Sequence, residues 1–189
     1  MTYKGLPLYD VLFFDEKSVF NNIALVTEPA IGEDFIQLSK QNINMKIDQE
    51  KRIVSGPALI PDEPIYRNQG GKSYYIKYTA DTIKQMAINF FKTGRQTEGN
   101  VEHMMNVQGI TFFESYLLNK ERGIAPKEFE NLPDGTWILS ARVDNDDVWE
   151  LIKQGALTGF SISIEGVGLN EEKEIETLED FLNYLNNNE

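Results

Sequence analysis

Short runs in which apolar and polar residues alternate, bounded by turn-forming residues, dominate the chain. Such alternation is typical of β-strands with one buried face, because successive side chains of a strand point to opposite faces of its sheet. The pattern predicts strands at residues 8–14, 23–31, 45–47, 52–60, 74–78, 101–103, 110–118, 135–143 and 156–168. It leaves residues 61–73, which hold two Pro and a Gly pair, as a loop.

Two segments instead place apolar residues at helical spacing. Residues 79–94 begin at a capping residue, Thr79 or Asp81, and end at Gly94, and residues 144–155 begin at an Asp or Asn cap and end at Gly155. The strands come in runs and do not alternate strictly with helices. This order predicts an α+β fold with a mostly antiparallel, barrel-like β-sheet and two or three surrounding helices.

The last twenty or so residues differ from the rest of the chain because they are strongly acidic. Their apolar residues follow the i, i+3, i+7, i+10 spacing of a short amphipathic helix, which could dock on a partner or on its own domain: Ile175, Leu178, Leu182 and Leu185. A chain of 189 residues is long enough for one domain with a real core. We therefore expect one domain at residues 1–169 and an acidic tail at residues 170–189.

Charge and composition narrow the class of partner. A net charge of −12 and a pI near 4.6 oppose binding to nucleic acid, which relies on Lys and Arg to displace phosphate counterions. No apolar run approaches the roughly 18 residues of a membrane span, and no basic segment followed by an apolar run begins the chain. These features predict protein partners and no membrane association, and they predict that the protein stays in the compartment in which it is made.

Candidate chemistry centres on one histidine and one strand. The chain contains no cysteine, so a covalent nucleophile must be another side chain, and His103 is its single histidine. Ser161, Ser163 and Glu165 alternate with apolar residues and therefore share one face of a predicted strand. A serine becomes a nucleophile only when a base takes its proton, although lone histidines and surface serines are more often structural than catalytic.

A third group normally orients the histidine of such a pair. The candidates are carboxylates: Glu102, Glu114, Asp144, Asp146 and Glu165. Glu114 ranks first because a strand that follows His103 allows a cross-strand contact, whereas Glu102 would face away from His103 if this segment were extended.

Sites for metals and nucleotides are not indicated. The sequence DNDD at residues 144–147 is better explained by helix capping than by calcium binding, because the later Gly and Glu of a calcium loop are absent. NQGG at residues 68–71 lacks the Lys and the Ser or Thr of a phosphate-binding loop. We expect no cofactor and no metal.

Several segments, in this order, resemble the phage prohead protease group, and most closely the XkdF-like phage serine proteases: IALVTEPAI, IVSGPALIPDEPIYR, YYIKYTADTIKQMA, VEHMMNVQGITFFESYLL, GTWILSARVDNDDVWELIKQG and LTGFSISIEG. That group is similar to the herpesvirus assemblin-type proteases, which implies a closed β-barrel with helices around it. The resemblance also implies a serine endopeptidase in which His103 and Ser161 form the catalytic pair. One departure is an extra Ser-Ile pair before Glu165, so Ser163 is an alternative nucleophile.

The resemblance further implies a role in capsid maturation. The expected substrates are the phage scaffold protein, the N-terminal part of the major capsid protein and the enzyme itself, inside the prohead in the cytoplasm of the bacterial host. A homodimer is suggested by the herpesvirus relatives. The alternative is a catalytically inactive capsid assembly or virion structural protein that keeps the protease fold.

Overall fold

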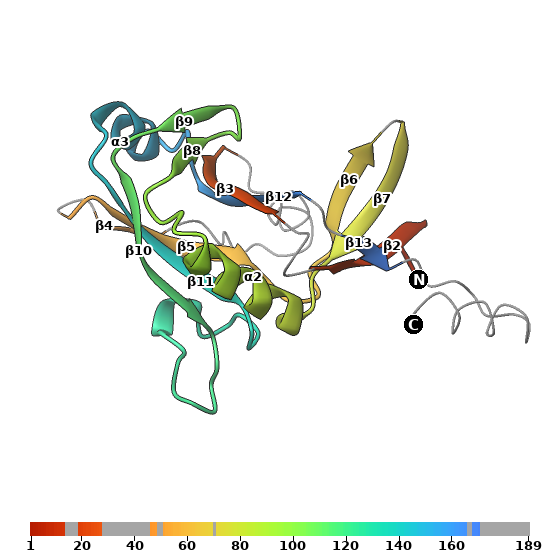
Figure 1. Ribbon diagram of the computed structural model, residues 1–189. Coiled ribbons are helices and arrows are strands. Elements are labelled where there is room, and N and C mark those ends of the chain that lie inside the picture. Colours follow the sequence, from red (N-terminus) through yellow and green to blue (C-terminus); the bar gives the residue numbers. More distant parts are fainter. Residues whose placement is uncertain (14–18, 28–45, 49–50, 70, 166–167, 171–189) are drawn as a thin grey trace, which may run out of the picture.

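A computed structural model describes residues 1–13, 19–27, 46–48, 51–69, 71–165 and 168–170, and its strands fall into three sheets (Figure 1). The sheet that carries the candidate residues has the order β12-β3-β8-β9, with β12 at Gly159–Glu165, β3 at Val19–Val26, β8 at Gly99–Val101 and β9 at Met105–Val107. β3 pairs antiparallel with β12 and parallel with β8, so it is the strand that joins the two halves of this sheet.

The second sheet is antiparallel and forms the base of the core. Its order is β10-β11-β5-β4, with β10 at Ile110–Leu117, β11 at Trp137–Val143, β5 at Ile53–Leu59 and β4 at Lys46–Asp48. β4 and β5 form the hairpin that the sequence predicts here. The central strand, β11, is buried almost throughout, which fits its run of apolar residues.

The third sheet holds the N-terminus and a hairpin that the sequence did not predict. Its members are β1 (Thr2–Tyr3), β2 (Leu6–Leu12), β7 (Lys72–Lys77), β6 (Ile65–Gln69) and β13 (Gly168–Asn170). The prediction of a loop over residues 61–73 is therefore wrong. Residues 65–69 contain no Pro or Gly and pair with β7, while Pro61, Pro64 and the Gly pair at 70–71 lie in the sequence on either side of this strand, where turn-forming residues are expected.

Two α-helices and a 3₁₀ turn at Lys127–Phe129 lie within the part of the chain that the structure describes. α2 runs over Ala80–Lys92 and is capped by the Thr79 hydroxyl, which accepts a hydrogen bond from the Thr82 N–H. α3 runs over Asp146–Lys153 and is capped in the same way by Asn145. Both helices thus confirm the predicted starts. Within the described ranges, no helix is long and apolar enough to span a bilayer.

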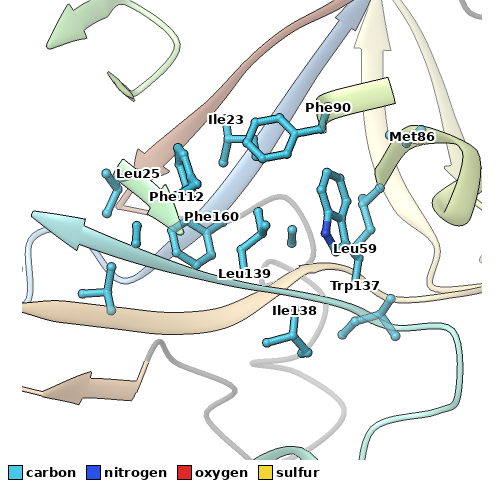
Figure 2. Packing of buried hydrophobic residues seen from close by; sticks show 14 of the residues in the cluster. Ile23, Leu25, Leu59, Met86, Phe90, Phe112, Trp137, Ile138, Leu139 and Phe160 are labelled. Carbon is cyan, nitrogen blue, oxygen red and sulfur yellow. The ribbon is translucent and has the colours of Figure 1, made fainter. Parts of the chain in front are cut away.

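Within the hydrophobic core, a cluster of aromatic rings links α2 to β10, β11 and β12 (Figure 2). The Phe90 ring lies 5.8 Å from that of Phe112 and 5.9 Å from that of Trp137, and Phe112 lies 5.9 Å from Phe160. Phe160 on β12 is almost fully buried. Because side chains alternate along a strand, this burial turns Ser161 to the opposite face of the sheet.

The fold agrees only in part with the expected architecture. Helices and mostly antiparallel strands are present, in line with an α+β fold. The described strands form separate sheets and no closed barrel, so the herpesvirus-like barrel is not confirmed. The predicted helix in the acidic tail falls at residues 171–189, outside the described part of the chain.

Gly99 allows β8 to approach the buried strand β10, and we predict that Gly99→Ala destabilises the protein. A Cβ at this position would lie 2.6 Å from Cβ and 2.8 Å from Cδ1 of Ile110, which is 1% exposed. Overpacking of this kind costs about 1–3 kcal/mol, measurable as a lower urea midpoint.

The control is a double-mutant cycle with Ile110→Ala, which removes Cγ1 and Cδ1. Gly99→Ala should cost less in that background, because the two side chains compete for the same space. Because Ile110→Ala retains the Cβ that lies 2.6 Å away, part of the cost should remain, and strict additivity would contradict only the clash with Cγ1 and Cδ1.

Candidate active site

Ser161 and Asn22 lie on one face of two paired strands. The register of β12 against β3 places Ser161 opposite Ala24 and Ser163 opposite Asn22. Residues directly opposite one another share a face, so Asn22 is a diagonal neighbour of Ser161. The face that carries Ser161 is the one directed away from the buried Phe160.

His103 reaches this face from a strained turn between β8 and β9. The backbone φ angles of Glu102 and His103 are 55° and 56°, both in the left-handed region that side chains other than glycine rarely adopt, and the Met104 N–H donates to Val101 O at 3.0 Å. The predicted strand at residues 101–103 is therefore wrong beyond Val101: residues 102–104 form a turn, and Met105–Val107 is β9.

The strained turn is held by bonds to the end of β3. The Glu102 carboxylate accepts hydrogen bonds from the N–H and the hydroxyl of Thr27, at 2.6 and 2.7 Å, and the Glu102 N–H donates to Leu25 O at 3.1 Å. Left-handed residues cost roughly 1–2 kcal/mol each and persist where their surroundings fix them. The hydrogen bonds to Thr27 and Leu25 hold the turn in this conformation and thereby set the position of the imidazole.

The three side chains form one hydrogen-bonded chain. His103 Nδ1 lies 2.7 Å from Asn22 Oδ1, and His103 Nε2 lies 2.9 Å from Ser161 Oγ. An amide oxygen can only accept, so Nδ1 carries the proton and donates to Asn22. Nε2 is then left to accept the hydroxyl proton of Ser161. A serine, a base in hydrogen-bond reach and a group that fixes the base are the elements of a serine hydrolase site.

The comparison with protein families agrees with this geometry. The family model described as "Putative phage serine protease XkdF" matches residues 40–170. The chain belongs to this family. The match includes His103 and Ser161, whereas Asn22 lies before its first residue.

Two proteins of Bacillus subtilis (strain 168) are similar to the chain. It is 28% identical over 118 residues to "Phage-like element PBSX protein XkdF", covering 60% of this chain and 37% of that protein. It is 32% identical over 89 residues to "Uncharacterized protein YqbD", covering 45% of this chain and 24% of that protein. The chain thus spans little more than a third of the first relative and about a quarter of the second. No solved structure matches it.

The electrostatic surroundings keep His103 neutral. The ring loses part of its water shell in the site, and this desolvation lowers the pKa of His103 below its usual 6.5. The negative charge of Glu102 opposes the shift by raising the pKa, and the positive charge of Arg67 adds to it by lowering the pKa. The net result is an unprotonated imidazole at neutral pH, which is the form that can accept a proton.

Glu114, the expected third group, does not lie at the histidine. Its carboxylate accepts a hydrogen bond from the hydroxyl of Ser140, which in turn contacts Ser55 in the sheet of β10, β11 and β5. A register shift between Phe112 and Glu114 accompanies this inward contact. Asn22 occupies the position next to His103 because β3, and not β10, is the neighbour of β8 in its sheet.

Two of the other candidates form ion pairs elsewhere in the fold. Asp144 binds Arg142 and Asp146 binds Arg52, at 2.8 and 2.6 Å. The side chain of Glu165 is outside the described residues. Ser163 shares the face of Ser161 but makes no described hydrogen bond to His103. Among the residues that the structure describes, no group of three or more His, Asp or Glu side chains could hold a metal ion.

Asn22 was missed because only carboxylates were considered for the third position. A neutral amide oxygen also accepts a hydrogen bond from Nδ1–H, although a weaker one than a carboxylate accepts. The sequence feature that points to Asn22 is its polar side chain within β3, directly before the apolar run IALV.

The single histidine makes its titration directly measurable, and we predict that it titrates below pH 6.5 in the folded protein and near 6.5 in urea. The cause is the desolvation that disfavours the charged ring. Glu102→Gln should lower the folded pKa further, because it removes a charge that stabilises the imidazolium while its amide oxygen can still accept from Thr27.

NMR of the imidazole C–H signals provides the measurement. Glu121→Gln, an exposed change in the turn after β10, is the matched control and should leave the pKa unchanged. A folded pKa at or above 6.5 would contradict this description of the site.

Proposed function

We propose that this chain is a serine endopeptidase of phage prohead maturation, with Ser161 as nucleophile, His103 as general base and Asn22 as the group that orients the base. The observation that carries the proposal is the continuous chain of hydrogen bonds from Asn22 through His103 to Ser161. The residues come from two strands and a turn that are far apart in the sequence, and the family is one of phage serine proteases.

The mechanism is acyl transfer. His103 Nε2 takes the hydroxyl proton as Ser161 Oγ attacks the carbonyl carbon of the scissile peptide bond. The imidazolium then gives this proton to the leaving amine as the C–N bond breaks. Water, activated by the same nitrogen, releases the acyl group from Ser161. Asn22 keeps the ring in the tautomer whose Nε2 can accept.

The backbone of β12 offers a donor for the oxyanion. The Leu25 carbonyl accepts from the Glu102 N–H on the β8 side of β3, so the backbone groups of Ala24, one residue earlier, face β12 and its register partner Ser161. By alternation, the N–H groups of Phe160 and Ile162 are directed away from β3, toward the side of β12 that no described strand pairs with. A donor there is suited to the negative oxygen of a tetrahedral intermediate.

In many serine hydrolases one aspartate both orients the histidine and stabilises its protonated form. In this chain two residues share these tasks. Asn22 orients the imidazole but carries no charge to stabilise its protonated form. Glu102 supplies a negative charge near the ring, and this charge raises the pKa of His103. Its hydrogen bonds to Thr27 keep it from binding the imidazole directly.

The proposed substrates are the phage scaffold protein, the N-terminal part of the major capsid protein and the enzyme itself. The support is the family to which the chain belongs, together with the phage-related name of one relative. Confinement inside an immature shell would raise the local substrate concentration, which replaces the need for high affinity.

We predict that a fluorophosphonate probe labels Ser161 in the wild-type protein, because attack on phosphorus requires only the activated hydroxyl. Ser161→Ala and His103→Ala should abolish labelling, and Ser163→Ala, the matched control two residues away on the same face, should retain it. Peptide mass spectrometry identifies the labelled residue.

The same variants, incubated with the scaffold and capsid proteins of the phage, test the substrates. Cleavage by wild type and Ser163→Ala alone is the expected result. Labelling at Ser163 would transfer the nucleophile to that residue. An unlabelled wild type that cleaves nothing in assembled proheads would favour the inactive structural protein.

Asn22 yields a separate prediction. Asn22→Ala should lower kcat by about 10²-fold with little change in KM, because the ring loses the group that fixes its orientation. Asn22→Asp keeps an acceptor and adds a negative charge, so it should retain activity while the acid limb of the pH–rate profile moves to higher pH. Equal loss in both variants, with no shift of the limb, would contradict the orienting role.

A further inference from the structure

A depression lies beside Ser161, between β5, β6 and β12. Its walls are mainly buried apolar side chains, and it has one charged member: it is lined by Ala58, Leu59, Ile65, Arg67, Tyr78, Phe160, Ser161 and Ile162. Ser161 and Arg67 therefore border the same hollow. A group bound there would lie next to the proposed scissile bond.

Arg67 is held in place by neutral partners. Its Nη1 donates to Tyr66 O at 3.0 Å. Burial raises the pKa of Tyr78, which is 8% exposed, and the Arg67 guanidinium lies close enough to the Tyr78 hydroxyl for its charge to oppose this larger rise by lowering the pKa. These contacts fix the guanidinium without neutralising its charge, and a guanidinium has five N–H donors in all. Donors remain for a ligand.

Arg67 combines partial burial with the lack of a carboxylate partner among the described residues. Within the described ranges, no Asp or Glu lies within ion-pair distance of it, whereas other cations of the fold do pair with carboxylates: Lys51, Arg52, Lys77, Arg95, Arg142 and Lys153. A partly buried charge without a partner is costly. The cost is offset when a bound anion completes the pair.

The charge of Arg67 also reaches the proposed catalytic residues, since it is one of the groups that lower the pKa of His103. Glu102 is the other charged group that acts on this ring, with the opposite sign. Arg67 is thus close enough to the imidazole for its charge to be felt there.

We propose that Arg67 determines substrate specificity by binding the carboxylate of an acidic side chain close to the scissile bond. The inference rests on the proposed function and names its substrate class: proteins with Glu or Asp beside the cleaved bond. The apolar walls of Ile65 and Ala58 suit the aliphatic part of such a side chain, and the planar guanidinium suits a two-pronged bond to its carboxylate.

An alternative role for Arg67 is stabilisation of the oxyanion. The two roles differ in what they affect. An oxyanion donor acts on every substrate and is expressed in kcat, whereas a specificity residue acts only on substrates with the matching charge and is expressed mainly in KM.

The experiment uses matched peptides spanning a cleavage site mapped in the scaffold or capsid protein, with Glu, Gln or Lys at each position flanking the cleaved bond. Wild type should cleave the best Glu peptide at least about tenfold faster in kcat/KM than its Gln counterpart, mainly through KM. At pH 8, where His103 is unprotonated with or without the charge of Arg67, Arg67→Met should remove this preference while changing cleavage of the Gln peptide little, and Arg67→Glu should favour the Lys peptide. Arg122→Met, an exposed change, is the control.

Fluorophosphonate labelling at pH 8 checks that each variant retains the Ser161–His103 pair, because this small probe has no acidic side chain. A wild type that cleaves without an acidic preference, or an Arg67→Met variant that slows all peptides equally, would overturn the specificity role and leave the protease intact. A wild type that neither labels nor cleaves would overturn both proposals.

Discussion

The pairing of β3 with a neighbour on each side is the constraint on which the site depends. On one side β12 presents Ser161, on the other side β8 leads into the turn with His103, and β3 itself carries Asn22. A shift of one residue in either register would turn a side chain to the opposite face. The aromatic contact between Phe160 and Phe112, deep in the core, opposes such a shift because it fixes which face of β12 is buried.

The turn at Glu102 and His103 shows how the fold maintains an unfavourable backbone where chemistry is proposed. Two successive left-handed residues without glycine are a local cost, and the bonds of Glu102 to Thr27 and Leu25 offset it. Glu102 therefore acts in two ways. It anchors the turn mechanically and influences the ring electrostatically, so that the position and the pKa of His103 depend on one side chain.

The sequence predicted correctly those features that depend on residues close together in the chain. The start of α2 at Thr79 and of α3 at Asn145 followed from capping residues, and the strand face of Ser161 followed from alternation. The β6 strand did not, because its pairing with β7 is specified by the partner strand. Asn22 did not either, since it meets His103 only after β3 and β8 have paired side by side. Sequence spacing contains no information on that neighbour.

The charges around the ring explain why an amide is suited to the third position. Glu102 already raises the pKa of His103, and a carboxylate in place of Asn22 would add a second negative charge directly on Nδ1. The imidazole would then hold its proton to higher pH and be less available as a base. Asn22 orients the ring without this effect, while Arg67 and desolvation keep the pKa low. The residues at positions 22 and 102 therefore affect the pKa of His103 together. A protein of this fold with Asp at the position of Asn22 would need a neutral residue at the position of Glu102 to keep the same histidine pKa.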